Sequence, residues 1–213
     1  MEAKVDTFVV DVRGELEAWP TLTPTPTVTP TPTPTVTVTP TPRFVDNGDG
    51  TIIDNQTGLQ WEKKVAGSGC LHCVDDMYNW SIYGSPYPDG AAFTGFLATL
   101  NGGATGVGNC VDDGTSPPTG VSGGFAGHCD WRLPTIVELQ TIMDLTKGFC
   151  GGSWPGDPCI DPIFGPTRAD LYWSSTSVAI APSLAWHVHF NFGRARYDDK
   201  WHGFWVRAVR GGS

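Results

Sequence analysis

The amino-acid sequence predicts an α+β domain with two helices and a small antiparallel sheet, preceded by an extended linker. The first observation is a run of alternating residues from Ala185 to Gly193, the pattern of a strand with one buried and one exposed face. The second is a pair of segments with the spacing of amphipathic helices. The third is composition: 27 glycines and 18 prolines imply many turns, while nine tryptophans and ten phenylalanines are enough for a folded core.

Three parts are expected along the chain. Residues 1–19 are too short to fold alone and lack the pattern of a signal peptide, so we interpret them as the end of an upstream region or as part of a fragment. Residues 20–42 consist of Thr and Pro with a few Val and one Leu. This composition favours extended polyproline II, which at about 3.1 Å per residue would span roughly 70 Å as a stalk or a plain spacer. The folded domain is expected to cover residues 43–213.

The domain begins with a predicted turn at residues 46–50, which hold Asp, Asn and Gly in the order Asp-Asn-Gly-Asp-Gly. These residues tolerate positive φ, which favours a tight turn between two short strands. The segment is a poor calcium loop, because Gly48 and Gly50 stand where side-chain oxygens are needed.

Two helices are predicted next. The first follows Asp89 and ends at Gly102 and Gly103. Its expected buried stripe consists of Phe93, Phe96, Leu97 and Leu100. The second begins with a capping box from Thr135 to Glu138. Its expected buried face consists of Leu139, Ile142, Met143 and Leu145. Arg132 is expected to pair with a local carboxylate beneath this second helix.

The cysteines predict disulfides and an oxidising compartment. They are Cys70, Cys73, Cys110, Cys129, Cys150 and Cys159. Many pairings are open, and we favour the three that close local loops: Cys70–Cys73, Cys110–Cys129 and Cys150–Cys159. The Cys70-Leu71-His72-Cys73 sequence also fits a redox pair or half of a zinc site. No second pair at matched spacing follows, and Val74 in place of histidine argues against a c-type haem.

The C-terminal segment carries the candidate binding surface. On the expected strand, three residues point into the core: Trp186, Val188 and Phe190. The alternate residues point outward, and beyond a turn at residues 191–193 a second segment adds aromatic and charged residues. Such side chains at exposed positions favour a binding surface, because tryptophan, tyrosine and arginine dominate interface energetics. An ordinary β-rich core with polar decoration is the alternative. The predicted ligand-binding residues are His187, His189, Asn191, Phe192, Arg194, Arg196, Tyr197, Asp198, Asp199, Trp201, His202 and Phe204.

Five segments carry motifs in a fixed order: Arg43 to Lys64, Ala126 to Asp144, Cys159 to Pro166, Tyr172 to Thr176 and Phe204 to Gly212. Together they resemble one bacterial family, the domain of unknown function 1566, also named for the C-terminal domain of Legionella collagen-like adhesins. The resemblance covers residues 43–212. It implies a C-type-lectin-like fold in which the last strand, Trp205 to Val209, pairs with the first. It also implies a place at the cell surface or outside the cell.

The same fold occurs in variable proteins of diversity-generating retroelements, whose C-terminal residues change at template adenines. Mutating both adenines of an asparagine codon gives His, Tyr, Asp, Ser, Gly, Phe, Arg and Leu, among others, but not Lys or Trp. Most of the predicted surface residues fit this set. Lys200 and Trp201 do not, and would belong to the fixed framework. The resemblance therefore implies that the surface is hypervariable.

These observations favour a ligand-binding recognition module that is not an enzyme and needs no cofactor. The expected partner is a protein or carbohydrate on another cell, a phage or a matrix. The net charge of −9 argues against nucleic acid, and no apolar run is long enough for a membrane span. The alternatives are an enzyme resembling the formylglycine-generating oxidases, or a purely structural adhesin domain. The C-terminal segment contains no cysteine, serine–histidine–aspartate order or carboxylate pair that would assemble a catalytic site.

Metal binding is disfavoured on similar grounds. His187 and His189 are spaced to chelate a metal with His202, but no carboxylate stands at a defined spacing. The Glu-Pro-Asn and Trp-Asn-Asp triplets of calcium-dependent sugar-binding lectins are absent. This departure weakens the expectation of calcium-mediated sugar binding.

Overall fold

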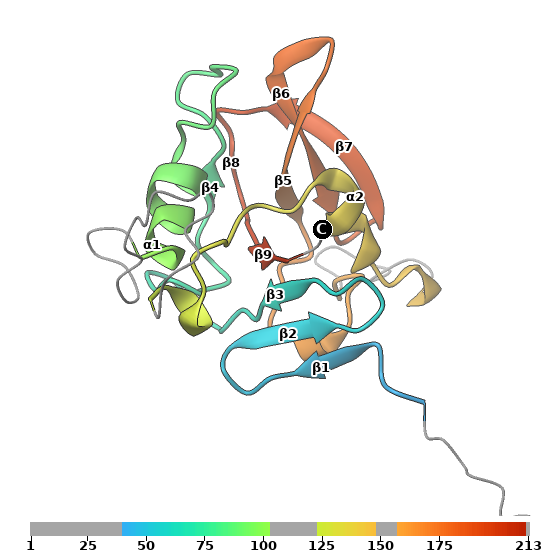
Figure 1. Cartoon of the computed structure of the whole chain (residues 1–213). Helices are drawn as coiled ribbons and strands as arrows, with labels where there is room; N and C mark the ends of the chain where they lie inside the picture. The colour runs from blue at the N-terminus through green and yellow to red at the C-terminus, as the bar shows by residue number, and fades with distance from the viewer. Residues whose placement is uncertain (1–39, 103–122, 148–156, 212–213) are drawn as a thin grey trace, which may run out of the picture. The chain divides into compact units, whose positions relative to one another are not determined.

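The computed structural model describes residues 40–102, 123–147 and 157–211, which form an α+β unit of small, mostly antiparallel sheets and short helices (Figure 1). The predicted α+β class is therefore confirmed. Residues 1–19 and most of the predicted linker, residues 20–39, lie outside the described residues.

The N-terminal strands and the C-terminus build a four-stranded antiparallel sheet. Its strands are β1 (Phe44–Asp46), β2 (Thr51–Asp54), β3 (Gln60–Glu62) and β9 (Val209–Arg210), in the order β1-β2-β3-β9. The predicted turn between the first two strands is confirmed, with Gly48 and Gly50 at φ values of 78° and 88°.

The expectation that the last strand, Trp205 to Val209, pairs with the first is wrong. The last strand is β9, and it pairs with β3 at the opposite edge of the sheet from β1. Val209 lies opposite the fully buried Trp61, and the Arg210 guanidinium donates to the Gln60 Oε1 at 2.7 Å. These two contacts fix the C-terminus beside β3.

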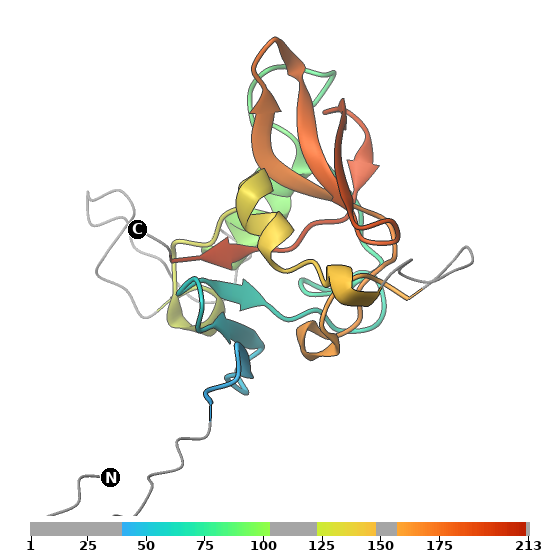
Figure 2. The same ribbon diagram turned by 90° about the vertical axis from the view of Figure 1, so that its right-hand side faces the viewer.

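A three-stranded antiparallel sheet follows later in the chain, and Figure 2 shows it above the first sheet. Its strands are β5 (Leu171–Val178), β6 (Ala181–His189) and β7 (Arg194–Asp199). The predicted strand and turn are confirmed, because the backbone N–H groups of Phe192 and Gly193 both donate to the His189 carbonyl. A third, two-stranded sheet pairs β4 (Tyr78–Asn79) with β8 (Gly203–Phe204).

The first predicted helix is a π-helical turn, η1 (Ala92–Leu97), that continues into α1 (Ala98–Leu100). Three of the four residues predicted to be buried are buried, and Phe93 is half-buried. The helix follows Asp89 as predicted, but the Asp89 carboxylate does not cap it and accepts the backbone N–H of Ile82 at 2.8 Å. It ends near Gly102, at a φ of 79°, and Gly103 lies outside the described residues.

The second helix, α2 (Ile136–Thr141), begins with the predicted capping box. Leu139 and Ile142 are buried and Met143 is half-buried. Leu145 is exposed, contrary to expectation, because the helix ends before it and the chain enters a 3-10 turn, η3 (Leu145–Lys147). The other 3-10 turns are η2 (Phe125–Gly127) and η4 (Pro162–Phe164). None of the helices among the described residues has the length and hydropathy needed to cross a membrane.

The core consists of two apolar clusters, and strands β5 and β6 contribute to both. The first cluster includes Trp80, Phe96, Leu100, Trp131, Trp173 and Ala185. The second includes Ile52, Trp61, Leu139, Tyr172, Val188 and Phe190. Val188 and Phe190 are thus buried as predicted. Because adjacent residues of β5 enter different clusters, both faces of this part of the sheet are covered.

Candidate functional site

The predicted surface residues lie on the β6–β7 hairpin and on the segment between β7 and β8. Three cross-strand pairs share one face of the hairpin: Ala185 with Asp198, His187 with Arg196, and His189 with Arg194. We name this side the arginine face, because Arg194 and Arg196 are exposed on it. Tyr197 lies on the opposite side, where its ring packs edge-on against Trp186 with centroids 5.3 Å apart. The predicted residues are therefore divided between two faces.

Two of the predicted surface residues are buried. His187 is 3% exposed and Asn191 is 4% exposed, so the expectation that both point into solvent is wrong. Trp186, expected in the core, is only half-buried. His187 is buried because the arginine face is covered at this point. Trp173 of β5 and Phe204 of β8 lie edge-on to the His187 ring, at centroid distances of 5.9 and 5.3 Å.

The surroundings of His187 keep its ring neutral. Burial lowers the pKa of His187 to about 4; Asp198 opposes this shift, whereas His189 and Arg196 add to it. The ring therefore carries no charge near pH 7. Its Nδ1 atom has no hydrogen-bond partner among the described residues. Burial also lowers the pKa of His189. We interpret His187 as a packing element beneath the arginine face.

The exposed end of the arginine face combines an aromatic ring with a cation. The Arg194 guanidinium lies 5.1 Å from the centroid of Phe192, and this ring in turn lies 4.4 Å from the His189 ring. A cation over an aromatic face is attracted to the ring and remains available to a partner.

Beyond β7, the surface continues through Asp198, His202 and Trp201. The His202 Nδ1 lies 2.9 Å from an Asp198 carboxylate oxygen, and the His202 ring lies 4.0 Å from the Trp201 ring. Trp201 is 56% exposed. Asp199 and Phe204, also predicted as ligand-binding residues, are half-buried.

Sequence reasoning missed a second segment, Met77 to Tyr87, that adjoins Trp201. A Cβ atom built on Gly84 would lie 3.7 Å from the Trp201 ring, so this segment and the tryptophan are in contact. Tyr83, at a φ of 58°, is 97% exposed, and Tyr87 is exposed as well. The available signal was the Tyr83-Gly84-Ser85-Pro86-Tyr87 sequence, in which tyrosines flank residues typical of turns.

Lys200 holds this segment against the sheet. The side chain is fully buried, and its Nζ donates to the Pro86 carbonyl at 2.9 Å and to Ser177 Oγ at 2.7 Å. The Lys200 carbonyl accepts the backbone N–H groups of Trp80 and Ser81. Its place is structural, as expected of a framework residue.

The predicted pairing of Arg132 is confirmed. Its guanidinium donates to both carboxylate oxygens of Glu138 in α2, at 2.7 and 2.6 Å. Burial alone would raise the pKa of Glu138, but the bonds from Arg132 and from the Thr135 backbone lower it below its ordinary value.

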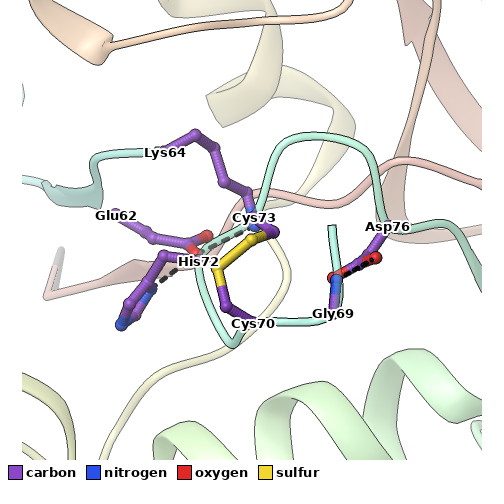
Figure 3. The surroundings of a disulfide bond; sticks show 7 residues. All are labelled: Glu62, Lys64, Gly69, Cys70, His72, Cys73 and Asp76. Atoms are coloured by element: carbon purple, nitrogen blue, oxygen red, sulfur yellow. Dashed lines mark hydrogen bonds and ion pairs between the residues drawn. A yellow bond between two sulfur atoms is a disulfide. The ribbon is translucent and has the colours of Figure 1, made fainter. Parts of the chain in front are cut away.

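A buried charged cluster, also missed, lies beside a disulfide (Figure 3). The Glu62 Oε1 accepts from Lys64 Nζ at 2.8 Å and lies 2.9 Å from His72 Nδ1, and the Oε2 accepts the backbone N–H of Ala208. Burial raises the pKa of Glu62, but the charge of Lys64 and the bonds to both partners outweigh it and lower the pKa. Arg207 is also fully buried, and donates to the Glu62 carbonyl at 2.7 Å. These contacts join β3 to the segment before β9.

Of the three predicted disulfides, Cys70–Cys73 is confirmed, with Cα atoms 5.0 Å apart. Cys129 and Cys159 are also disulfide-bonded. Their expected partners, Cys110 and Cys150, lie outside the described residues. In residues 40–102, 123–147 and 157–211, no group of three or more His, Cys, Asp or Glu side chains is placed to hold a metal ion.

An α+β unit with disulfide-bonded loops and an exposed surface of aromatic and arginine residues defines a candidate binding domain. Residues 50–210 match the Lcl C-terminal domain family, so the chain belongs to that family. This confirms the family resemblance and indicates a surface-associated domain of the collagen-like adhesin type. No curated protein and no solved structure matches the chain.

Proposed function

We propose that this chain is a non-catalytic recognition module, displayed outside the cell or at its surface on the Thr/Pro stalk, that binds a protein or glycan partner. The observation that carries the proposal is the exposed set of Arg194, Arg196 and Trp201, which Tyr83 and Tyr87 extend. Arginine, tryptophan and tyrosine are the residue types that most often supply binding energy in interfaces. The disulfides support an oxidising compartment.

The rigid support of the surface favours recognition over a structural role. Lys200 and the buried His187 fix the side chains that lie around them without occupying the exposed positions. An ordered framework beneath exposed contact residues lowers the entropy lost on binding.

We also propose that the exposed positions are diversified. Phe192, Arg194, Arg196 and Tyr197 are exposed and fall within the set reachable from adenine mutation. His187 and Asn191 also fall within that set, but their burial makes variation there costly. The test is the DNA around the locus. We expect an adenine-rich, imperfect repeat of the 3′ coding region beside a reverse transcriptase, with mismatches at the exposed codons; a locus without such a repeat would remove this part of the proposal.

The finer fold assignment, a C-type-lectin-like domain, belongs to the same proposal. Two features favour it: a pair of helices, and a C-terminal strand that returns to the N-terminal sheet. A crystal structure whose comparison with known folds places it elsewhere would contradict this assignment.

The runner-up function is an oxidase resembling the formylglycine-generating enzymes. A copper-dependent oxidase assay on cysteine-containing peptides separates the two. We expect no turnover, and measurable turnover that is lost in a Cys70→Ser/Cys73→Ser variant would favour the enzyme.

The recognition proposal is tested by binding. The full chain is applied to an array of immobilised glycans and matrix proteins, together with an Arg194→Ser/Arg196→Ser/Trp201→Ser variant. The matched control is Val137→Ser/Gln140→Ser, two exposed positions on α2. A hot-spot loss of about 2 kcal/mol corresponds to roughly thirtyfold weaker binding. We expect that loss in the triple variant alone; equal binding by all three proteins would contradict the proposed surface.

A further inference from the structure

The Cys70–Cys73 disulfide lies where an exposed loop meets the buried Glu62 cluster (Figure 3). Every residue from Val65 to Cys70 is exposed, whereas Cys73 is 4% exposed. The two cysteines of one bond therefore differ in their exposure to solvent. A thiolate from solution can approach the side of Cys70, and the bond then breaks toward the side of Cys73.

The other described cysteines, Cys129 and Cys159, are more enclosed than Cys70. Cys159 is fully buried and Cys129 is half-buried. Because thiol–disulfide exchange requires the attacking thiolate to reach a sulfur, access decides which bond reacts first. Cys70 is the most exposed cysteine in the part of the chain that the structure describes.

We infer that the Cys70–Cys73 disulfide is a thiol-exchange site whose co-substrate is a small dithiol. The dithiol's first thiolate attacks the Cys70 sulfur, the bond between the two protein sulfurs breaks, and the Cys73 sulfur takes the electron pair and then a proton. The second thiolate of the dithiol then attacks the first sulfur of the same dithiol, which is bonded to Cys70 in the mixed disulfide. This step expels the Cys70 sulfur, which is also protonated. Two electrons pass to the protein, leaving two protein thiols and a cyclic disulfide of the reductant.

The surrounding hydrogen bonds keep the opened loop in place. The Val65 N–H donates to the His72 carbonyl at 3.0 Å, and the Val74 N–H donates to the Val65 carbonyl at 2.9 Å. The Gly69 N–H donates to the carboxylate of Asp76. None of these bonds requires the disulfide, so the two thiols stay near each other and can be reoxidised to the same bond.

His72 links the state of this disulfide to the interior. It lies inside the four-residue ring of the disulfide, contacts Glu62 at 2.9 Å, and its ring lies 4.2 Å from the Phe125 ring. Opening the ring loosens the constraint on the residue that covers a buried carboxylate. The expected effect of reduction is local to this loop, with the two core clusters intact. The inference is independent of the proposed recognition surface.

The test is differential alkylation of the native full chain. Dithiothreitol is the probe, N-ethylmaleimide quenches at intervals, and peptide mapping gives the labelling rate of each cysteine. Tryptophan fluorescence is followed in the same samples. We expect Cys70 and Cys73 to be labelled at least about tenfold faster than Cys129 and Cys159, with no change in fluorescence. Labelling of Cys129 or Cys159 at an equal or higher rate would overturn the inference, and so would labelling that appears only as the fluorescence reports unfolding.

Two further measurements complete the test. A Cys70→Ser/Cys73→Ser variant should lack the fast phase and retain the slow one. In hydrogen exchange, the amide of Cys73, which donates to the Cys70 carbonyl inside the disulfide ring, should exchange faster after reduction, while the amides of Val65, Val74 and Trp61 should not. Faster exchange at Trp61 would show that reduction unfolds the sheet, which contradicts a local exchange site.

Discussion

The Nζ atom of Lys200 lies 3.6 Å from the centroid of the Trp80 ring, above a residue of the first core cluster. Burial lowers the pKa of Lys200, and the nearby Asp89 partly opposes that shift. The buried ammonium is nevertheless stabilised, because it donates hydrogen bonds to two oxygens and lies over an aromatic face. This single side chain connects the end of β7 to the Met77–Tyr87 segment.

Replacing Lys200 should therefore destabilise the domain. Lys200→Met keeps the apolar stem but leaves the Pro86 carbonyl and Ser177 Oγ without their donor. We expect the free energy of unfolding to fall by about 3 kcal/mol, since each bond from a charged donor contributes roughly 1.5–3 kcal/mol. Urea denaturation measures it. Lys63→Met is the control, because its ion pair with Asp46 lies at the surface, where such pairs contribute little to stability. Equal losses in the two variants would contradict the anchoring role of Lys200.

The arginine face gives a second, contrasting prediction. Arg194→Ser and Arg196→Ser should each change the free energy of unfolding by less than about 0.5 kcal/mol, because both side chains are exposed. His187→Ser should cost roughly 2 kcal/mol or more, because it leaves a cavity beneath Trp173 and Phe204. Thermal melts of the three variants decide the matter. An unstable Arg196→Ser protein would place that arginine in the framework.

The contrast between the exposed Arg196 and the buried His187 shows how much of the site could be predicted from the sequence. Alternation in β6 correctly predicted the strand, the turn at residues 191–193 and the burial of Val188 and Phe190. It misplaced His187, since a period of two reports which residues share a face but not whether that face is covered. Phe204 and Trp173 cover His187, and they lie 17 and 14 positions away from it in the sequence.

The pH dependence of stability gives a third prediction. His187 has a folded pKa of about 4, below its ordinary value of 6.5, because it is buried. Above pH 6.5 both folded and unfolded states hold it neutral, and its contribution to stability is complete. Between pH 6.5 and 4 the unfolded state binds the proton more tightly, so stability is lost as the pH falls.

We expect the protein to lose about 2 kcal/mol through His187 between pH 7.5 and pH 4.5, allowing for partial access of water. His187→Phe retains an aromatic ring and removes the titration. The drop in the free energy of unfolding over this range should therefore be smaller in the variant by that amount. Identical pH profiles for the two proteins would show that His187 does not titrate as its surroundings predict.

The missed part of the site has a different cause. Tyr83 and Tyr87 lie in a loop without periodicity, and Gly84 between them approaches Trp201 beside the paired strands β4 and β8. Such non-local pairing leaves no local pattern in the sequence. The Glu62 cluster was missed for a similar reason, since Glu62 and Arg207 lie 145 positions apart and meet only when β9 joins β3. In contrast, the capping box and the Arg132 pairing are local, and both were predicted correctly.

The Glu138 carboxylate allows the fourth prediction, at the start of α2. It accepts the Thr135 N–H in the capping box and two bonds from Arg132. Glu138→Gln weakens both interactions, so we expect the free energy of unfolding to fall by about 1–2 kcal/mol at neutral pH. Because the folded pKa of Glu138 lies below its ordinary value of 4.5, this stabilisation is complete above pH 4.5 and is lost as the pH falls through the lowered folded pKa. The difference in the free energy of unfolding between the two proteins should therefore shrink in acid.

Urea denaturation of both proteins at pH 7 and pH 3 measures this difference, with Gln140→Ala on the exposed side of the same helix as control. A difference that stays constant with pH would assign the effect to helix propensity instead of the carboxylate.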